Sequence, residues 1–267
     1  MDKYRVKPGE KIKLKDFDPA DTSHVPNGKQ AGMPWLAELT EKLGTLQEML
    51  YAEHKHRVLV VLQARDAAGK DSTITSVFSG VNPQGVRVAN FKVPSEIERD
   101  HDYLWRIHQQ MPGKGELVIF NRSHYEDVLV VRVHELVTKD IWSKRYDQIS
   151  AFEQMLADEG VTIVKFYLDV SKDVQKERLQ ERIDEPAKNW KFNPDDLKER
   201  ALWEEYTNAY EDAFNKTSTR QAPWYIIPAD HNWYRNLCVA SILVKTLENL
   251  NMAYPAPAPN LKNIVIE

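Results

Sequence analysis

The residues best suited to chemistry form one short loop after the apolar run 58–62: Asp66, Ala67, Ala68, Gly69, Lys70 and Asp71. An apolar strand that turns through Gly-Lys into a helix binds phosphate, because backbone N–H groups and the positive helix start face the anion. The lysine adds a mobile charge. The common template is G-x-x-x-x-G-K-[ST]. Here Ala64 replaces the first glycine, Asp71 replaces the Ser/Thr, and Asp66 is an acid inside the loop. We predict a phosphate-binding loop of unusual form.

A second polar segment follows the apolar run 116–120. Arg122, at the end of this predicted strand, can clamp phosphate oxygens through two hydrogen bonds. Glu126 and Asp127 offer the carboxylate oxygens that Mg²⁺ prefers. Ligands in open α/β sheets bind at the carboxyl ends of strands, which places this segment beside the phosphate loop. The alternative is a polar turn without a ligand.

A row of cations marks the segment 176–191. Arg178 and Arg182 are four residues apart and share one helix face, and Lys188 and Lys191 extend the row into a loop. Such a row can neutralise a phosphate chain and close over it as a lid. The alternative is a solvated helix face whose cations pair with neighbouring acids.

Composition narrows the class of protein. The chain has 267 residues, a formal net charge of −4 and a single cysteine, so neither a global basic surface for nucleic acid nor an internal disulfide is expected. No apolar run approaches the ~20 residues that span a bilayer, and the first residues lack a secretory signal. The histidines show no metal-ligand spacing. We expect a cytoplasmic protein without membrane or nucleic-acid partners.

Hydrophobic patterns alternate between strands and helices along the chain. The predicted strands are 57–63, 86–91, 116–120, 161–168 and 224–228. The predicted helices are 35–50, 71–81, 95–111, an interrupted stretch up to 159, most of 171–218, and 233–250. This alternation predicts an α/β fold with a parallel sheet covered on both faces. We expect one domain, 1–267, with an N-terminal extension over 1–34 and a lid at about 171–200.

Aromatic residues repeat at helical spacing between Trp203 and Phe214. The repeat indicates either a core-facing helix or an oligomer contact. The sequence leaves both open.

Three segments, 63–71, 120–133 and 188–191, resemble the polyphosphate kinase 2 family, and the Asn-Arg-Ser-His-Tyr-Glu-Asp sequence from Asn121 resembles its third class. The resemblance implies a thymidylate-kinase-like P-loop fold with a five-stranded parallel sheet and a helical lid. It also implies a Mg²⁺-dependent enzyme, with Mn²⁺ as an alternative, that reversibly moves the terminal phosphoryl group of inorganic polyphosphate onto AMP and ADP. Members of the family often form dimers or tetramers.

The resemblance and the local chemistry together give each residue a role. The expected catalytic residues are Asp66, Lys70, Arg122, Glu126 and Asp127. Phosphate and nucleotide are expected to contact Ala67, Ala68, Gly69, Asp71, Asn121, Arg178, Arg182, Lys188 and Lys191. The expected metal ligands are Asp66, Glu126 and Asp127.

Asn121 departs from other classes of the family, which carry an aspartate there. An amide is a poorer Mg²⁺ ligand, so we shift part of the metal role to the two acids that follow. Two rival functions stay open. The first is an ATP-dependent nucleotide kinase, against which Asp71 argues because it replaces the usual Ser/Thr. The second is a non-catalytic polyanion-binding protein, in which carboxylates beside the loop would not contribute to binding.

Overall fold

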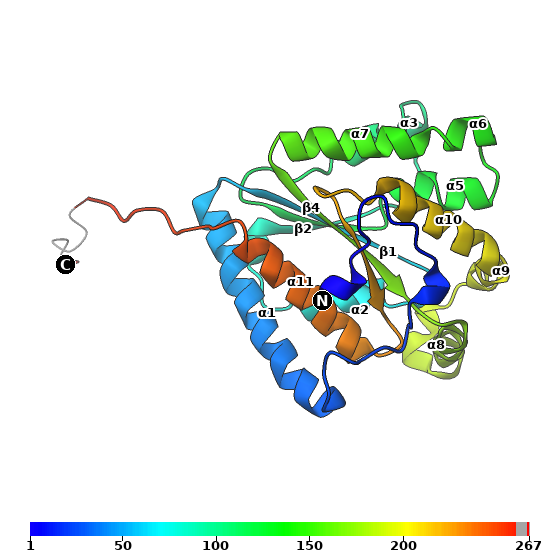
Figure 1. Cartoon of the computed structure of the whole chain (residues 1–267), viewed down its shortest axis with the longest axis horizontal. Helices are drawn as coiled ribbons and strands as arrows, with labels where there is room; N and C mark the ends of the chain where they lie inside the picture. Colours follow the sequence, from blue (N-terminus) through cyan, green and yellow to red (C-terminus); the bar gives the residue numbers. More distant parts are fainter. Residues whose placement is uncertain (260–265, 267) are drawn as a thin grey trace.

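A five-stranded parallel sheet forms the centre of the protein (Figure 1). The structure is a computed structural model, and it describes residues 1–259 and residue 266. The strands are β1 (Arg57–Ala64), β2 (Val86–Asn90), β3 (Leu117–Asn121), β4 (Val161–Asp169) and β5 (Trp224–Pro228), in the order β2-β3-β1-β4-β5. The predicted parallel sheet is confirmed, and the strands lie within two residues of their predicted bounds.

Helices connect the strands and cover the sheet. The α-helices are α1 (Gly28–Glu53), α2 (Lys70–Val77), α3 (Glu96–Arg99), α4 (Trp105–His108), α5 (Val130–Val133), α6 (Lys139–Trp142), α7 (Arg145–Asp158), α8 (Lys172–Asp184), α9 (Asp195–Ala201), α10 (Trp203–Thr217) and α11 (Asn232–Glu248). The 3-10 turns are η1 (Asp2–Tyr4), η2 (Leu14–Asp16), η3 (Pro83–Gly85), η4 (His124–Asp127) and η5 (Pro186–Lys191).

The sheet separates two apolar cores. On β1, Val60 and Leu62 pack into the core beneath α1 and α11, whereas Leu59 and Val61 pack into the core beneath α7 and α10. Figure 1 shows these two pairs of helices on opposite sides of the sheet. Burial on both faces explains why β1 is a continuous apolar run rather than an alternating one. The central strand therefore delivers its loop at a rigid position.

Helix α1 begins at Gly28, seven residues before the predicted start, so its first turns lie within the predicted extension. Pro34 lies inside it and removes one helical hydrogen bond. Packing against α11 compensates, since Gly32 lies so close to Trp233 that an added Cβ would stand 2.3 Å from the indole ring. Packing against α11 therefore outweighs the helix-breaking tendency of Pro34.

The predicted helix 95–111 is wrong as a single element. It is divided into α3 and α4, separated by a turn at Asp102. The Asp102 carboxylate accepts a hydrogen bond from the Leu104 N–H at 2.9 Å, and its carbonyl accepts one from the Trp105 N–H at 3.1 Å. Side-chain capping of this kind favours a turn over a continuous helix.

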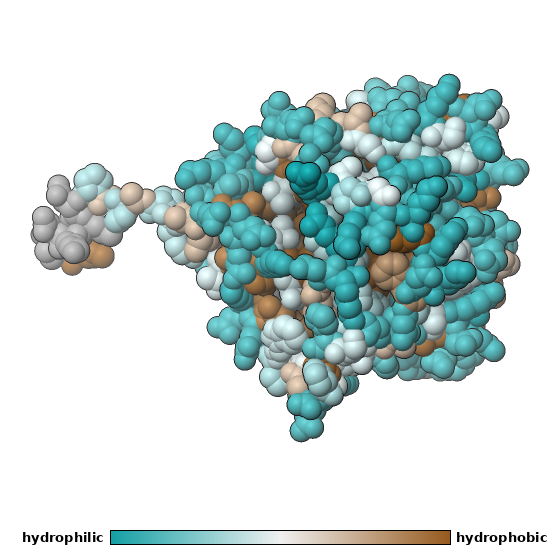
Figure 2. All heavy atoms as spheres, in the orientation of Figure 1, coloured by the Kyte–Doolittle hydropathy of each residue, from teal (hydrophilic) through white to brown (hydrophobic). Residues whose placement is uncertain are grey.

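The aromatic series on α10 belongs to the core. Tyr206, Tyr210 and Phe214 are buried, which excludes the alternative of an exposed oligomer contact for these three. The face drawn in Figure 2 is mostly hydrophilic, with scattered apolar patches. Within the described residues no helix is long and apolar enough to cross a membrane.

Candidate active site

The loop between β1 and α2 has the backbone of a phosphate site. Gly69 is the residue before α2 and has φ +102°, and Ala67 also has a positive φ of 60°. Two left-handed residues so close together turn the chain sharply and free the first N–H groups of α2. The Lys70 ammonium donates to the Ala64 carbonyl at 3.2 Å, and burial, together with Arg122, lowers its pKa. The predicted loop is therefore built as a cradle.

Arg122 joins two acids at the end of β3. Its guanidinium lies 3.0 Å from an Asp66 carboxylate oxygen and 3.3 Å from one of Glu126. The negative charges of Glu126 and Asp66 hold the pKa of Arg122 above its ordinary value. Burial acts in the opposite direction but is outweighed. Its backbone has φ +61°, an uncommon conformation for arginine that turns the chain at the strand end. The structure thus brings three predicted site residues into contact.

Asn121 acts on the loop through hydrogen bonds. Its amide nitrogen lies 2.8 Å from Asp71 and 3.0 Å from the side-chain oxygen of Asn90 on β2. Asp71, which replaces the usual Ser/Thr of the loop, is therefore held by Asn121, which stands where other classes of the family have an aspartate. These two departures from the common pattern occur together in space.

A cavity of about 490 Å³ lies over the loop. Predicted residues from the loop, from β3 and from the lid share this space: Asp66, Ala67, Gly69, Lys70, Asp71, Asn121, Arg122, Arg178, Arg182, Lys188 and Lys191. Ala68 is buried beneath it. Lys92 and the 78% exposed Trp190 also line this cavity, and neither was predicted. Cationic side chains outnumber acidic ones in the lining by seven to four, and we call this space the cationic cavity.

A second, smaller cavity of about 290 Å³ adjoins the Asp66–Arg122 pair. Both residues line it as well as the larger cavity. Its lining combines the aromatic residues Trp203, Tyr206 and Tyr210 with five acids, Glu126 among them, and three arginines. The ion pair therefore lines both the cationic cavity and this second one, which we call the aromatic cavity.

Asp127 lies apart from both cavities. Its carboxylate is 3.0 Å from the Arg145 guanidinium and largely buried, and burial raises its pKa to about 6. Among the described residues, no group of three or more histidine, cysteine or acidic side chains has the geometry of a metal site. The predicted Asp127 ligand is therefore not brought together with Asp66, although Glu126 is.

The lid cations divide into three kinds. Arg178 donates from one nitrogen to the Ala67 and Ala68 carbonyls, at 3.2 and 3.3 Å, so it organises the loop. Arg182 forms an ion pair with Asp196 at 2.9 Å. Lys188 pairs with Glu181 and Glu185 on the same segment. Arg182 and Lys188 thus pair with nearby acids, as the alternative to a lid predicts, whereas Arg178 is held by carbonyls of the loop.

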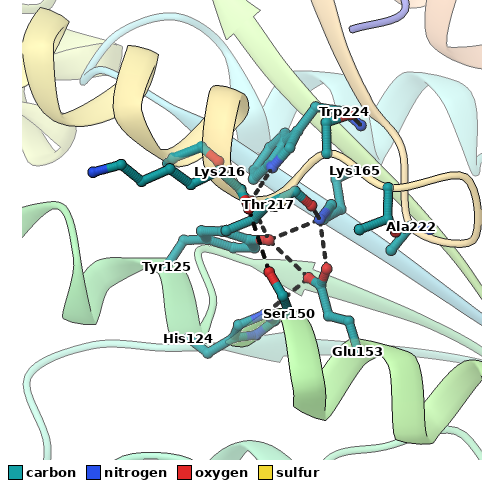
Figure 3. A network of polar contacts seen from close by, with 12 residues as sticks. His124, Tyr125, Ser150, Glu153, Lys165, Lys216, Thr217, Ala222 and Trp224 are labelled. Atoms are coloured by element: carbon teal, nitrogen blue, oxygen red, sulfur yellow. Dashed lines mark hydrogen bonds and ion pairs between the residues drawn. The ribbon is translucent and has the colours of Figure 1, made fainter. Parts of the chain in front are cut away.

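A buried polar network supports the segment that carries Arg122 and Glu126 (Figure 3). Glu153 of α7 accepts from His124 at 3.1 Å and from Lys165 of β4 at 2.5 Å. The Tyr125 hydroxyl bonds to the same carboxylate at 2.9 Å. His124 and Tyr125 thus anchor η4 to two other elements.

Sequence reasoning missed Arg235, whose side chain is fully buried below the loop. It donates to the Ala68 carbonyl at 3.0 Å and to the Ser72 hydroxyl at 2.9 Å. An arginine near the start of helix α11, just before the apolar run 237–240, was the signal available in the sequence.

Strand β1, its loop and helix α2 form the strand–loop–helix unit of P-loop phosphate-binding proteins, with cations and acids of a phosphotransferase around it. The chain belongs to the polyphosphate kinase 2 family, whose model, "Polyphosphate kinase 2", matches residues 27–255.

Relatives of this family are similar to the chain over nearly its whole length. An "AMP/ADP-polyphosphate phosphotransferase" of Meiothermus ruber is 62% identical over 100% of both chains. An "ADP-polyphosphate phosphotransferase" of Rhodopseudomonas palustris is 44% identical over 96% of this chain and 92% of its own length. The crystal structure of polyphosphate kinase 2 from Arthrobacter aurescens TC1 has a TM-score of 0.93 at 40% identity, and covers 97% of this chain and 93% of its own.

Proposed function

We propose that this protein reversibly transfers the terminal phosphoryl group of inorganic polyphosphate to AMP and ADP, giving ADP and ATP. The names of its relatives support this reaction. The observation that carries it is the Asp66–Arg122 pair, which lines both the cationic cavity and the aromatic cavity. A reaction between a long anion and a nucleotide needs two such spaces that meet at one point.

The two cavities suit the two substrates. The cationic cavity offers Lys70, Lys92 and the lid lysines to successive phosphates. The aromatic cavity offers the partly exposed ring of Trp203, on which a nucleobase can stack. We place polyphosphate in the first and the nucleoside in the second, with the transferred group beside Arg122.

The residues present fit a divalent cation, and we propose Mg²⁺ with Mn²⁺ as an alternative. Mg²⁺ is bound in kinases through one or two carboxylates plus substrate phosphates, so a cage of three protein acids is not needed. Asp66 would hold it, with Glu126 nearby and Asp71 across the same loop. Bound there, the ion neutralises charge that develops on the phosphates. Asp127 is less suited, because Arg145 holds it.

Protein residues supply position and charge. The transferred phosphoryl passes through a loose transition state, so catalysis is mostly orientation plus electrostatic stabilisation. Lys70 and Arg122 hold the end of the phosphate chain, and the Gly69 turn presents backbone N–H groups. The acceptor is already an anionic phosphate oxygen at neutral pH, so no strong general base is required. Closure of the lid excludes water from the site.

An assay with polyphosphate plus AMP or ADP, with and without Mg²⁺, tests the proposal. ATP formed from polyphosphate supports it. Turnover with ATP as the only donor would favour the ATP-dependent nucleotide kinase. Salt-sensitive polyphosphate binding without turnover would favour the non-catalytic polyanion-binding protein.

The other expectations are part of the same proposal. We infer one domain over 1–267, of which residues 260–265 and 267 lie outside the described part, and a cytoplasmic homodimer or homotetramer. Light scattering of the purified chain measures the oligomeric state, and limited proteolysis tests the single domain.

A further inference from the structure

Arg235 is a buried cation whose hydrogen-bond acceptors are all uncharged. Its guanidinium donates to the Ala68 carbonyl, to the Ser72 hydroxyl, and to the side-chain oxygens of Asn232 and Asn236, at 2.8 to 3.2 Å. None of these partners within the described chain is a carboxylate. A buried charge without an opposite charge is costly and is rarely kept without a use.

A second cation lies close to Arg235. Arg178 donates to the same Ala68 carbonyl, at 3.3 Å, and to Asn232 at 3.0 Å. Burial, together with Arg178, lowers the pKa of Arg235 to about 9. Two guanidinium groups therefore converge on one carbonyl of the phosphate loop.

This convergence fixes the direction of a loop N–H group. The described chain has no cis peptide bond, and in a trans peptide the N–H points opposite to the C=O. Because the Ala68 carbonyl is turned toward Arg178 and Arg235, the Gly69 N–H points away from both guanidinium groups. Gly69 lines the cationic cavity, so this N–H is available to an anion there.

The contact also explains why residue 69 is glycine. A Cβ at this position would lie 2.1 Å from a terminal nitrogen of Arg235 and 2.8 Å from its central carbon. The positive φ of 102° adds a second constraint. The loop and the guanidinium therefore pack as one unit.

We propose that Arg235 is a positioning residue that holds the phosphate loop open to its ligand, and that the bound phosphate chain supplies the negative charge that the buried guanidinium lacks. The inference rests on the proposed function, since it takes a phosphate chain as the ligand. In this proposal two cations support phosphate binding by the loop: Arg235, buried beneath it, and Lys70, within it.

Asn236 offers an isosteric test. Its side-chain oxygen accepts from two nitrogens of Arg235, at 3.2 and 3.0 Å, and its side chain is buried away from the cavity lining. In Asn236→Asp, the geometry is kept and a counter-charge is placed beside the guanidinium. Arg235→Gln removes the charge instead, and Arg235→Lys keeps the charge without the planar fork. Asn208→Asp, an exposed position on α10, is the matched control for net charge.

The experiment is calorimetric titration of each full-length variant with tripolyphosphate. We expect the Kd to rise roughly tenfold in Asn236→Asp and in Arg235→Gln, to be partly restored in Arg235→Lys, and to be unchanged in Asn208→Asp. The urea midpoint of ligand-free Asn236→Asp should not fall below that of the wild type. In steady-state assays, the KM for polyphosphate should rise while the KM for ADP changes little.

A purely structural role for Arg235 predicts the opposite, because a carboxylate at 236 would hold the guanidinium more firmly and leave tripolyphosphate affinity equal or tighter. That result overturns the inference while wild-type binding keeps the proposed function intact. Absence of tripolyphosphate binding in the wild type would overturn both. If Asn236→Asp does not fold, equal affinity in Arg235→Gln and the wild type overturns the inference by itself.

Discussion

The side-chain amide of Asn121 donates a 2.8 Å hydrogen bond to the carboxylate of Asp71, and so ties the end of β3 to the first turn of α2. The same nitrogen reaches Asn90 on β2 at 3.0 Å. An amide can donate to Asp71, whereas an ionised carboxylate can only accept. The hydrogen bond therefore requires an amide at position 121 as well as a carboxylate at position 71.

Asn121→Asp should destabilise the protein when no divalent cation is present. The variant loses a donor and places two carboxylates opposite each other, which costs about 1 kcal/mol at this partly exposed site. Urea unfolding in EDTA measures the loss, and the same titration with MgCl₂ should narrow it because a cation can bridge the acids. Asn208→Asp is the control for added charge. Equal stability of the two variants in EDTA would contradict the expectation.

Lys70→Ala should reduce kcat about 100-fold or more, because it removes the charge that we propose stabilises the negative charge developing on the transferred phosphoryl group. Its single described hydrogen bond, to the Ala64 carbonyl, is a small contribution to stability, so folding should remain intact. The measurement is ATP formation from polyphosphate and ADP, with unfolding curves in parallel. Lys198→Ala, on the exposed surface of α9, should keep its activity. Wild-type turnover in Lys70→Ala would refute the assignment.

Local signals were sufficient to predict most of the fold. Strand β1 is buried on both faces and flanked by a turn, so its apolar run was visible without any partner. The loop from Asp66 to Asp71 carries its own signal in Gly-Lys. Helix bounds failed where distant packing decides them, as at Gly32 against Trp233.

The site was harder to predict because pairing is a long-range property. Arg178 reads as a free lid cation in sequence, yet it bonds to carbonyls more than a hundred residues away. Asp127 and Glu126 are adjacent in sequence, but Arg145 holds the first and Arg122 the second. Arg235 lies in a helix whose sequence matches no functional motif, so nothing local indicated its contact with the loop.

Asp169→Asn should stabilise the protein relative to the wild type, and by more at pH 8 than at pH 5. The Asp169 carboxyl is buried at the end of β4 and makes no hydrogen bond or ion pair through its side chain with the other described residues. Burial raises its pKa from 3.8 to about 7. The unfolded state thus loses this proton near pH 4 and the folded state near pH 7, so wild-type stability falls as pH rises between these values.

The amide variant removes that dependence. At pH 8 it should be more stable than the wild type by roughly 2 kcal/mol, the cost of a buried unpaired charge. Urea unfolding at both pH values gives the two differences. A difference that is the same at pH 5 and pH 8 would show that Asp169 does not titrate between them.

Glu153→Gln should cost about 3–5 kcal/mol of unfolding free energy, because it leaves the buried Lys165 ammonium without its counter-ion. Burial opposes the charge on Glu153, yet Lys165 and the His124 hydrogen bond together hold its pKa below the ordinary value. Lys165 therefore favours the charged form of the Glu153 carboxylate. Adding Lys165→Met to Glu153→Gln should recover part of the loss, since no unpaired ion then remains.

The double-mutant cycle separates the ion pair from the packing of the two side chains. Urea unfolding of the wild type, both single variants and the double variant gives the coupling energy. Because His124 and Tyr125 of the same network lie between Arg122 and Glu126, kcat should fall in the single variants under conditions where they are fully folded. Additive losses of stability in the double variant would mean that the buried ion pair does not support this segment.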